Sequence, residues 1–269
     1  SLKKQKRRLL VILDELEKVF EQIERRAEGS SLGLPEEVVA ALRSVIQSSS
    51  QVSFVLAGIT DVVRRHLLTP KARLFNLALQ VELAPLPRPA ASELISGVIG
   101  DAYSVTPRAE ALIMDETNCH PYLLQKVCHE LFQYMTDAAE PIATEPDVGS
   151  VLDTKIVPDS QSFVHFVETV RRRPEDMMLV DALAFIQSGL KFVSVGDLQR
   201  QLVRSGQSSG LLEVKDHLDD LRDQAPSLLE RASNNPRRYR IRVPLFARHR
   251  RLRQLTHHNL LLASRPSRV

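Results

Sequence analysis

The stretch that decides the fold is LLVILDE, residues 9–15, in which five apolar residues run directly into two acidic ones. A continuous apolar run with β-branched residues in its middle is typical of a strand buried on both faces, as in a parallel sheet. A second such run, residues 52–57, ends at Gly58. Between the runs, apolar residues recur at helical spacing over 16–28 and from Pro35 to about residue 47. This alternation predicts part of a doubly wound α/β sheet.

The predicted sheet is incomplete within the chain. A third short strand is expected at residues 79–83, and three apolar strands would still leave a sheet edge uncovered. We therefore expect the remaining strands upstream of residue 1, and the initial serine agrees with a fragment or a processed product. Residues 1–86 are interpreted as the C-terminal half of an α/β core.

The rest of the chain has mainly helical periodicity. Prolines 85, 87 and 89 form a stiff break, after which we expect helices at about 90–100, 107–116 and 121–137. Four further helices and a hairpin follow, with hairpin strands at 227–232 and 238–243, which is the pattern of a winged helix. The expected domains are a helical lid at 87–139, a linker at 140–162, a winged helix at 163–255 and a basic tail at 256–269.

Composition and charge exclude several classes of protein. With 43% hydrophobic and 26% charged residues the chain is not disordered, and it has no apolar run of the roughly 20 residues that a membrane span needs. The net charge of +3 hides an asymmetry, because residues 1–230 hold 25 basic and 33 acidic residues, whereas residues 231–269 hold eleven arginines and no acid. Cys119 and Cys128 are too few for a disulfide framework. We expect a cytoplasmic protein without membrane contact.

Acidic and polar residues follow both predicted core strands. Asp14 and Glu15 come after the first strand, where α/β folds bind ligands, and Thr60 follows the second. At this position a P-loop ATPase holds Mg²⁺ through the aspartate, by way of water, and polarises the attacking water with the next acid. The residues allow a simpler interpretation: acids favour the start of any helix, and Thr60 can be a helix N-cap.

Five segments in order resemble the AAA-like branch of the STAND and AAA+ P-loop ATPases, over about residues 8–255. Residues 9–15 are similar to a Walker B strand and 52–60 to a sensor-1 strand; 73–86 resemble the last core strand and the start of the lid. HPYLLQ at 120–125 resembles the Gly-x-Pro lid motif, and YRIRVPLF at 239–246 the end of the family's winged helix. The resemblance implies ATP and Mg²⁺ as cofactors. It implies that Asp14 acts on Mg²⁺, Glu15 on the water, Thr60 as sensor and Pro121 beside the nucleotide.

Two further residues have both a family role and a simpler one. Arg73 lies where AAA+ proteins often keep an arginine finger, although a surface arginine in a loop is the simpler interpretation. His120 either faces the adenine or caps the lid helix, and we favour the cap.

The chain departs from the family pattern in two places. Cys119 stands where the lid motif usually has glycine, so we expect another backbone geometry there. None of the ten glycines is followed by lysine, so no Gly-x-x-x-x-Gly-Lys-Ser/Thr loop is present to hold phosphates. The family places this loop upstream of Walker B. We therefore expect the N-terminal part of the same protein to supply it, and this chain alone to be inactive.

The arginine-rich end allows two kinds of partner. Arg237, Arg238, Arg240 and Arg242 are candidate contacts to a nucleic-acid backbone. The predicted recognition helix at 211–224, however, carries a net charge of −3, which does not suit a DNA major groove. The alternative is that the arginines dock on the acidic remainder, in cis or between subunits.

The favoured function is an ATP-dependent signalling switch, in which nucleotide state repositions the lid and the winged helix to control an effector domain or self-association. The first alternative is an ATP-regulated winged-helix protein that binds DNA. The second is a scaffold that does not hydrolyse ATP.

Overall fold

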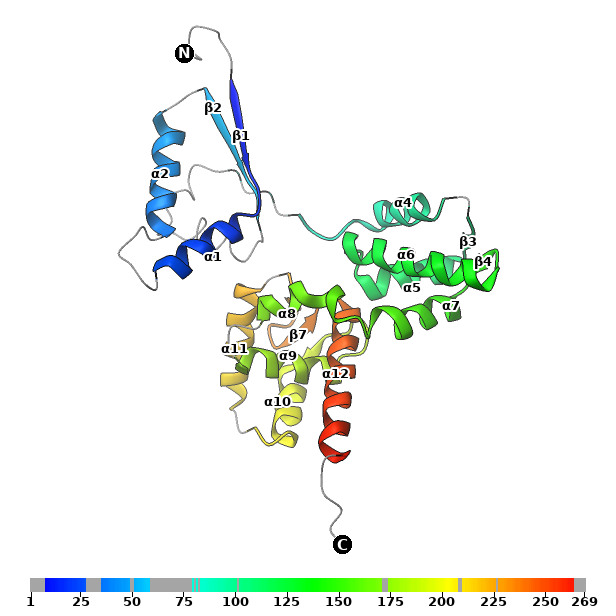
Figure 1. Cartoon of the computed structure of the whole chain (residues 1–269). Coiled ribbons are helices and arrows are strands. Elements are labelled where there is room, and N and C mark those ends of the chain that lie inside the picture. Colours follow the sequence, from blue (N-terminus) through cyan, green and yellow to red (C-terminus); the bar gives the residue numbers. More distant parts are fainter. Residues whose placement is uncertain are drawn as a thin grey trace. The chain divides into compact units, whose positions relative to one another are not determined.

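The computed structural model describes residues 8–27, 35–48, 51–58, 79, 81, 83–100, 102–170, 174–207, 210–225 and 227–263. The chain divides into two compact units, Ser1–Leu83 and Ala84–Val269, so the break falls three residues before the boundary expected at 86. Each unit is described by itself below, with the elements labelled in Figure 1.

The first unit contains the predicted parallel strands. Strand β1 (Leu9–Leu13) pairs in parallel with β2 (Val52–Leu56), from Leu9 opposite Val52 to Leu13 opposite Leu56. Helices α1 (Leu16–Ala27) and α2 (Pro35–Ser48) connect the strands. Leu16 and Phe20 of α1 are buried, at 3% and 1% exposure. The α/β interpretation of this segment is therefore confirmed.

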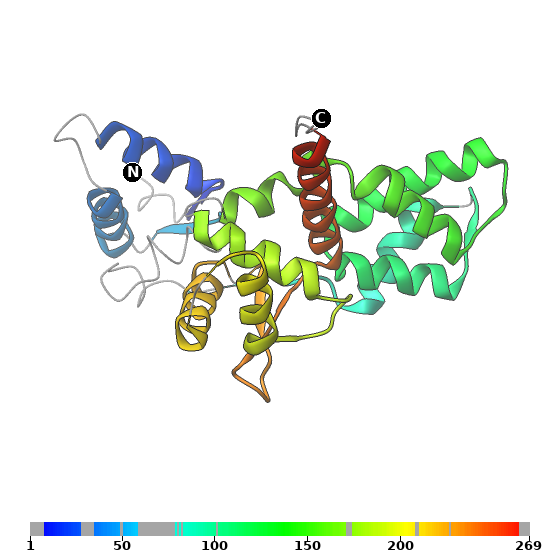
Figure 2. The same ribbon diagram turned by 90° about the horizontal axis from the view of Figure 1, so that it is seen from below.

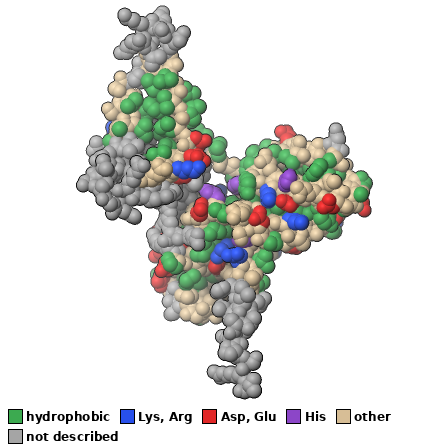
Figure 3. Space-filling model, viewed as in Figure 1, with side chains coloured by type: hydrophobic (Ala, Val, Ile, Leu, Met, Phe, Trp, Pro, Cys, Tyr) green, Lys and Arg blue, Asp and Glu red, His purple; other side chains and the backbone are tan. Residues whose placement is uncertain are grey.

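The strands are not buried on both faces, contrary to the expectation from their apolar runs. Leu10 and Ile12 of β1 are 57% and 62% exposed, and hydrophobic side chains gather over this strand pair in Figure 3. Within the described residues β1 pairs only with β2. The expected third strand is not found at residues 79, 81 and 83, which are irregular and exposed. The rest of that segment lies outside the described residues.

The second unit begins with the predicted helices. Helix α4 (Arg88–Ile99) is followed by α5 (Pro107–Thr117) and α6 (Pro121–Ala138). Each has a proline in its first turn, where the missing N–H has no intrahelical partner to lose. The two-residue strands β3 (Ser104–Val105) and β4 (Ile142–Ala143) pair in parallel beside these helices.

The expected linker at 140–162 is wrong, because this segment is folded. It contains β4, α7 (Glu145–Val151), the π-helical turn η2 (Leu152–Ile156) and most of the 3₁₀ turn η3 (Ser160–Phe163). Val148, Val151 and Ile156 have no exposed surface and belong to the main core cluster. The apolar residues recur at helical spacing, and this signal outweighs prolines 141, 146 and 158.

The winged helix is present as predicted. Its helices are α8 (Val164–Val170), α9 (Pro174–Ile186), α10 (Val195–Arg204) and α11 (Leu211–Gln224). Strands β5 (Val193–Ser194), β6 (Leu229–Arg231) and β7 (Arg238–Ile241) form an antiparallel sheet in the order β5-β7-β6. Leu229 of β6 lies opposite Ile241 of β7, and both are buried.

A helix that the sequence interpretation missed follows the sheet. Helix α12 runs from Pro244 to Ala263, so residues 256–263 continue a helix instead of forming the expected basic tail. Leu245, Phe246 and Ala247 are buried at its start, and α12 packs against both α9 and α5. Figure 2 shows α12 standing between the lid helices and the winged-helix group. Lid and winged helix therefore form one compact unit.

Candidate nucleotide site

The acidic pair stands at the carboxyl end of β1, as expected. The backbone N–H of Glu15 donates to Oδ1 of Asp14 at 2.8 Å, and Glu15 has a left-handed backbone with φ of 54°. The backbone N–H of Leu16 donates to the carbonyl oxygen of Ala57 at 3.2 Å. The turn after β1 is therefore fixed against the end of β2, and the two carboxylates are exposed.

The carboxylate of Glu15 is engaged by a neighbouring lysine. Nζ of Lys18 donates to Oε2 of Glu15 at 2.6 Å, and this hydrogen bond raises the pKa of Lys18. The side chains are 65% and 59% exposed, so the pair is weak and can exchange partners. The contact occupies Oε2 only, and an ionised carboxylate can accept further hydrogen bonds through its second oxygen.

Asp14 has the chemistry of a magnesium ligand but does not complete a site. Its exposed carboxylate is a hard oxygen donor, and Mg²⁺ prefers such donors together with bound water. Within the described part of the chain, no group of three His, Cys, Asp or Glu side chains is placed to hold a metal ion. The other two residues expected near the nucleotide in the core, Thr60 and Arg73, lie outside the described residues. The described core thus fits one edge of a Mg²⁺ site.

The lid motif in the second unit has a left-handed backbone turn without a glycine. Asn118 and Cys119 both have left-handed backbones, with φ of 48° and 55°. The expectation that Cys119 needs another geometry is therefore wrong. The backbone N–H of Cys119 donates to the carbonyl oxygen of Met114 at 3.1 Å, and its own carbonyl accepts from the N–H of Leu86 at 3.0 Å. These two hydrogen bonds hold the turn in a conformation that costs a non-glycine residue about 1 kcal/mol.

His120 is at the N-cap position of α6, but its side chain does not cap the helix. The imidazole packs edge-on against Phe166 of α8, with 5.7 Å between ring centroids, and its Nδ1 is buried without a hydrogen-bond partner among the described residues. Burial is the main cause that lowers the pKa of His120, and nearby His165 adds to it. Pro121 is at the first position of α6 and is exposed. The start of the lid helix therefore contacts the winged-helix module directly.

The two cysteines beside this motif are free and buried. Burial raises the pKa of the Cys128 thiol to about 12 and also raises that of Cys119. A protonated, buried thiol is a poor nucleophile and a poor metal ligand. The lid core thus uses both residues as small apolar side chains.

The four arginines predicted as one contact surface separate into two groups. Arg240 donates from Nε to Oε2 of Glu230 at 2.8 Å and lies over the ring of Phe192, 4.5 Å from its centroid. Arg242 is half-buried, and its Nε has no partner in the described structure. Arg237 and Arg238, in contrast, are exposed at the tip of the hairpin. Of these four arginines, Arg237 and Arg238 are the exposed ones in the described structure.

Other arginines of the basic end dock on acids of the same unit. Nε and Nη2 of Arg250 donate to the two carboxylate oxygens of Asp181 in α9, at 2.6 and 2.9 Å. Arg248 pairs with Glu116 of α5 at 3.3 Å and with Asp153 of η2. Docking in cis, one of the two arrangements open from the sequence, is therefore present, and in Figure 3 basic and acidic side chains intermingle on the visible face of this unit.

Comparisons with known proteins find similarity at the level of structure. No protein-family model and no curated protein sequence matches the chain. A variant of Thermotoga maritima RuvB is 14% identical with a TM-score of 0.43, over 85% of this chain and 66% of its own. Cdc6p from Pyrobaculum aerophilum is 12% identical with a TM-score of 0.38, over 96% of this chain and 69% of its own. The structure of Drosophila ORC bound to DNA contains a chain that is 13% identical with a TM-score of 0.33. The match covers 91% of this chain and 72% of that one.

These similar structures are of AAA+ P-loop ATPases, the class that the sequence resembles. The chain spans about two thirds of the RuvB chain, 66% of its length. Among the described residues, no helix is long and apolar enough to cross a membrane.

Proposed function

We propose that this chain is part of an ATP-dependent signalling switch related to the AAA+ ATPases. In this proposal the nucleotide state repositions the helical lid and the winged helix together, and their movement controls an effector domain or self-association. Asp14 acts on Mg²⁺ through water, Glu15 polarises the attacking water, and Thr60 senses the γ-phosphate. The segment around His120 and Pro121 contacts the nucleotide from the lid, and Arg73 serves as an arginine finger for a neighbouring subunit.

The observation that carries the proposal is the contact between His120 and Phe166. His120 opens the lid helix, and Phe166 lies in the first helix of the winged-helix module. Arg248 adds a second connection, from α12 to the lid through Glu116. A displacement of the lid motif is thus passed to the winged helix through packed side chains, which a flexible linker would not do.

The test measures Mg-ATP binding and phosphate release by the full-length protein and by this 269-residue chain. The key variant is Glu15→Gln, and its matched control is Glu17→Gln, which removes the same charge from the first turn of α1. We expect the full-length protein to bind ATP in all three forms and to lose phosphate release only in Glu15→Gln, by at least about a hundredfold. If both variants hydrolyse ATP equally fast, the two acids only stabilise the start of α1 by their charge. If the full-length protein does not bind ATP, the proposal is wrong.

DNA binding is the second candidate function, and the exposed Arg237 and Arg238 favour it. Contact would be with the phosphate backbone, because the recognition helix α11 keeps its acidic surface. Duplex binding that weakens steeply with salt and is lost in Arg237→Gln/Arg238→Gln would support this function. Unchanged binding in that variant would exclude the wing as the DNA contact.

A further inference from the structure

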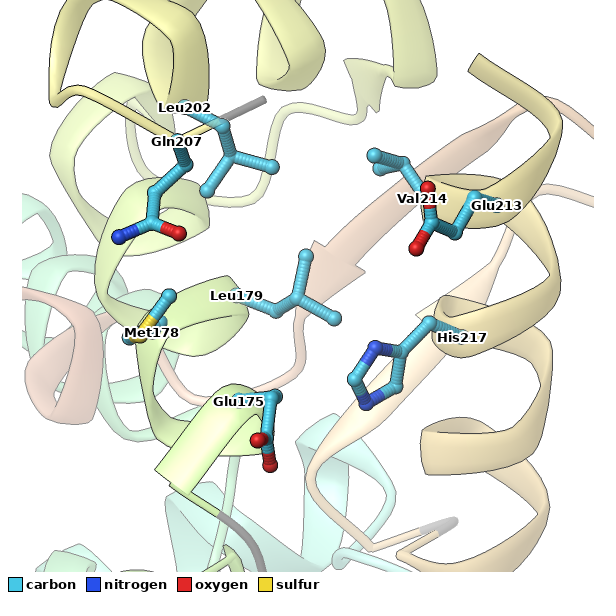
Figure 4. Close-up of a pocket in the computed structure, with 8 residues that line it drawn as sticks. All are labelled: Glu175, Met178, Leu179, Leu202, Gln207, Glu213, Val214 and His217. Carbon is cyan, nitrogen blue, oxygen red and sulfur yellow. The ribbon is translucent and has the colours of Figure 1, made fainter. Parts of the chain in front are cut away.

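A pocket of about 120 Å³ lies within the winged-helix module, between α9, α10 and α11. An apolar cavity of about 150 Å³ is large enough to bind benzene, so this pocket has room for the end of one large side chain. Figure 4 shows the residues that surround it. They are Glu175, Met178, Leu179, Leu202, Gln207, Glu213, Val214 and His217.

The pocket combines an apolar wall with an acidic rim. Leu179, Leu202 and Val214 are almost fully buried, at 5%, 4% and 2% exposure. Glu175 and Glu213 are exposed, and neither has an ion pair with a described residue, although Oε2 of Glu213 accepts the backbone N–H of Gly210 at 3.2 Å. A cation with an apolar stem satisfies both surfaces, because its stem covers the wall while its charge meets the carboxylates.

The third polar residue of the rim is held rigidly. Nε2 of His217 lies 2.7 Å from Oδ1 of Asp176, whose side chain is only 4% exposed. The buried carboxylate fixes the orientation of the imidazole, which therefore presents a flat face on one side of the pocket. Arginine suits this pocket better than lysine, since a planar guanidinium can stack on a ring while it donates to two carboxylates.

The same unit carries a matching pair of exposed arginines. Arg237 and Arg238, at the tip of the β6–β7 hairpin, are exposed and have no ion pair within the described residues. Hydrogen bonds hold the tip. They include N–H of Arg237 to Oδ1 of Asn235 at 3.0 Å, N–H of Arg238 to the carbonyl of Asn235 at 3.2 Å, and N–H of Ala232 to the carbonyl of Arg238 at 2.9 Å. Figure 2 shows this hairpin (orange) projecting from the helices. Such a preorganised tip loses little entropy on binding.

We propose that the wing tip of one copy inserts Arg237 or Arg238 into the pocket between α9, α10 and α11 of a second copy. Two observations carry this assignment: the opposite charges of the two surfaces, and the fact that neither surface has an ion pair among the described residues. Because the wing and the pocket are different surfaces of one unit, we take the contact to be head-to-tail. A pair of copies then keeps one free pocket on the first copy and one free wing on the second, and both can bind further copies. The inference deepens the self-association that belongs to the proposed function, but it requires no nucleotide.

The test follows self-association of this chain by sedimentation velocity over a range of protein concentrations at low salt. The pocket variant is Glu175→Gln/Glu213→Gln, in which glutamine still accepts the hydrogen bond from Gly210. The wing variant is Arg237→Gln/Arg238→Gln. Matched controls remove the same charges elsewhere on the surface, as Asp137→Asn/Glu140→Gln at the end of the lid helix and Arg108→Gln/Arg253→Gln, whose parent residues are all exposed.

We expect the original chain and both controls to form larger species as concentration rises, and each of the two variants to associate at least about tenfold more weakly. An equimolar mixture of the pocket variant and the wing variant is the decisive sample. It retains one intact wing and one intact pocket, so it forms a heterodimer that grows no further.

Three outcomes overturn the inference. The original chain stays monomeric at all concentrations, the controls weaken association as much as the variants do, or the mixture forms no heterodimer. ATP binding by the full-length protein is measured on the same variants. If association follows the expected pattern without ATP binding, the proposed function fails and the docking surface stands. If ATP binding is intact and the mixture stays monomeric, only the docking surface fails.

Discussion

His249 of α12 stacks on Phe163 of η3, with 4.7 Å between the ring centroids, and its Nδ1 donates to the carbonyl oxygen of Val157 at 2.7 Å. His249 is 2% exposed and Phe163 is fully buried. The two residues join η3 to α12. They form part of the core that makes lid and winged helix one unit.

This contact predicts a pH dependence of stability. Burial is the main cause that lowers the pKa of His249; Arg250 and Arg253 add to it, and the hydrogen bond to Val157 opposes it. Because the unfolded chain then binds the proton more readily, the stability contributed by neutral His249 is complete above about pH 6.5 and is lost as pH falls toward the folded pKa. This loss is measured by urea unfolding at about pH 5.5 and at about pH 7.5, one value below and one above the ordinary histidine pKa.

The variant His249→Phe keeps a ring on Phe163 but leaves the Val157 carbonyl without its donor. We expect it to lower the free energy of unfolding at neutral pH by about 1–3 kcal/mol and to reduce the difference between the two pH values. Part of the difference remains, because the pKa of His120 is lowered as well. The control His129→Gln changes an exposed histidine. An unaltered pH difference in His249→Phe would assign the effect to other groups.

The C-terminal end of α6 predicts a pair of opposite effects. Ala139, the C-cap residue, has a left-handed backbone with φ of 54°, whereas its neighbour Ala138 is the last helical residue. Glycine relieves strain at the first position and loosens the helix at the second. We expect Ala139→Gly to raise the free energy of unfolding by about 0.5–1 kcal/mol and Ala138→Gly to lower it by about the same amount. Thermal unfolding of the two variants measures these changes. Shifts of the melting temperature in the same direction would contradict the backbone argument.

Gln187 holds the winged-helix sheet to α9 from a position that is 1% exposed. Its Oε1 accepts the backbone N–H of Ile241 at 2.6 Å, and its Nε2 donates to the carbonyl oxygens of Ile241 at 2.9 Å and Gly189 at 2.8 Å. We expect Gln187→Leu to destabilise the protein by about 2–4 kcal/mol, since it leaves a buried peptide group without partners. Equilibrium urea unfolding measures this loss of stability. The exposed control Gln133→Leu is expected to stay within about 0.5 kcal/mol.

The ion pair between Arg250 and Asp181 is expected to contribute more to the free energy of unfolding than an exposed pair does. Its side chains are 14% and 24% exposed and share two hydrogen bonds. Arg250→Ala should cost about 1–3 kcal/mol and Arg250→Lys less, because lysine keeps the charge and loses the paired geometry. Arg200 and Asp197 form an exposed pair, with side chains that are 68% and 50% exposed. Arg200→Ala should therefore lower the free energy of unfolding by less than about 0.5 kcal/mol. Equal losses for Arg250→Ala and Arg200→Ala, measured by urea unfolding, would refute this difference.

Local signals in the sequence predicted most helices and the parallel strand pair. Pro35, Pro107, Pro121 and Pro174 each open a helix as expected from a first-turn proline. Helix α12 was missed although Pro244 is such a proline: residues 239–246 were interpreted only by their resemblance to the end of a winged helix. The same reliance on a motif led to the wrong geometry for Cys119, where hydrogen bonds to Met114 and Leu86 hold a left-handed backbone without glycine.

The sequence predicted the position of the acidic residues of the candidate site. It did not predict the contacts that the site residues make. Asp14 and Glu15 lie where a strand end places them, but the ion pair of Glu15 with Lys18 depends on the turn between them. His120 was expected to cap a helix, and its ring instead packs on Phe166, 46 positions away in the numbering. The pocket around Glu213 has no sequence motif, because three separate helices and a loop contribute its residues.

By itself the sequence determined the order of the elements, the parallel core segment, the helical lid and the winged helix, because apolar periodicity, prolines and turn residues act over a few positions. Only the tertiary structure decided which arginines remain free. Arg248 pairs with Asp153 and Arg250 with Asp181, across 95 and 69 positions, while Arg237 and Arg238 stay exposed. Such pairings depend on which surfaces the packed core brings together. No local pattern of charge therefore specifies them.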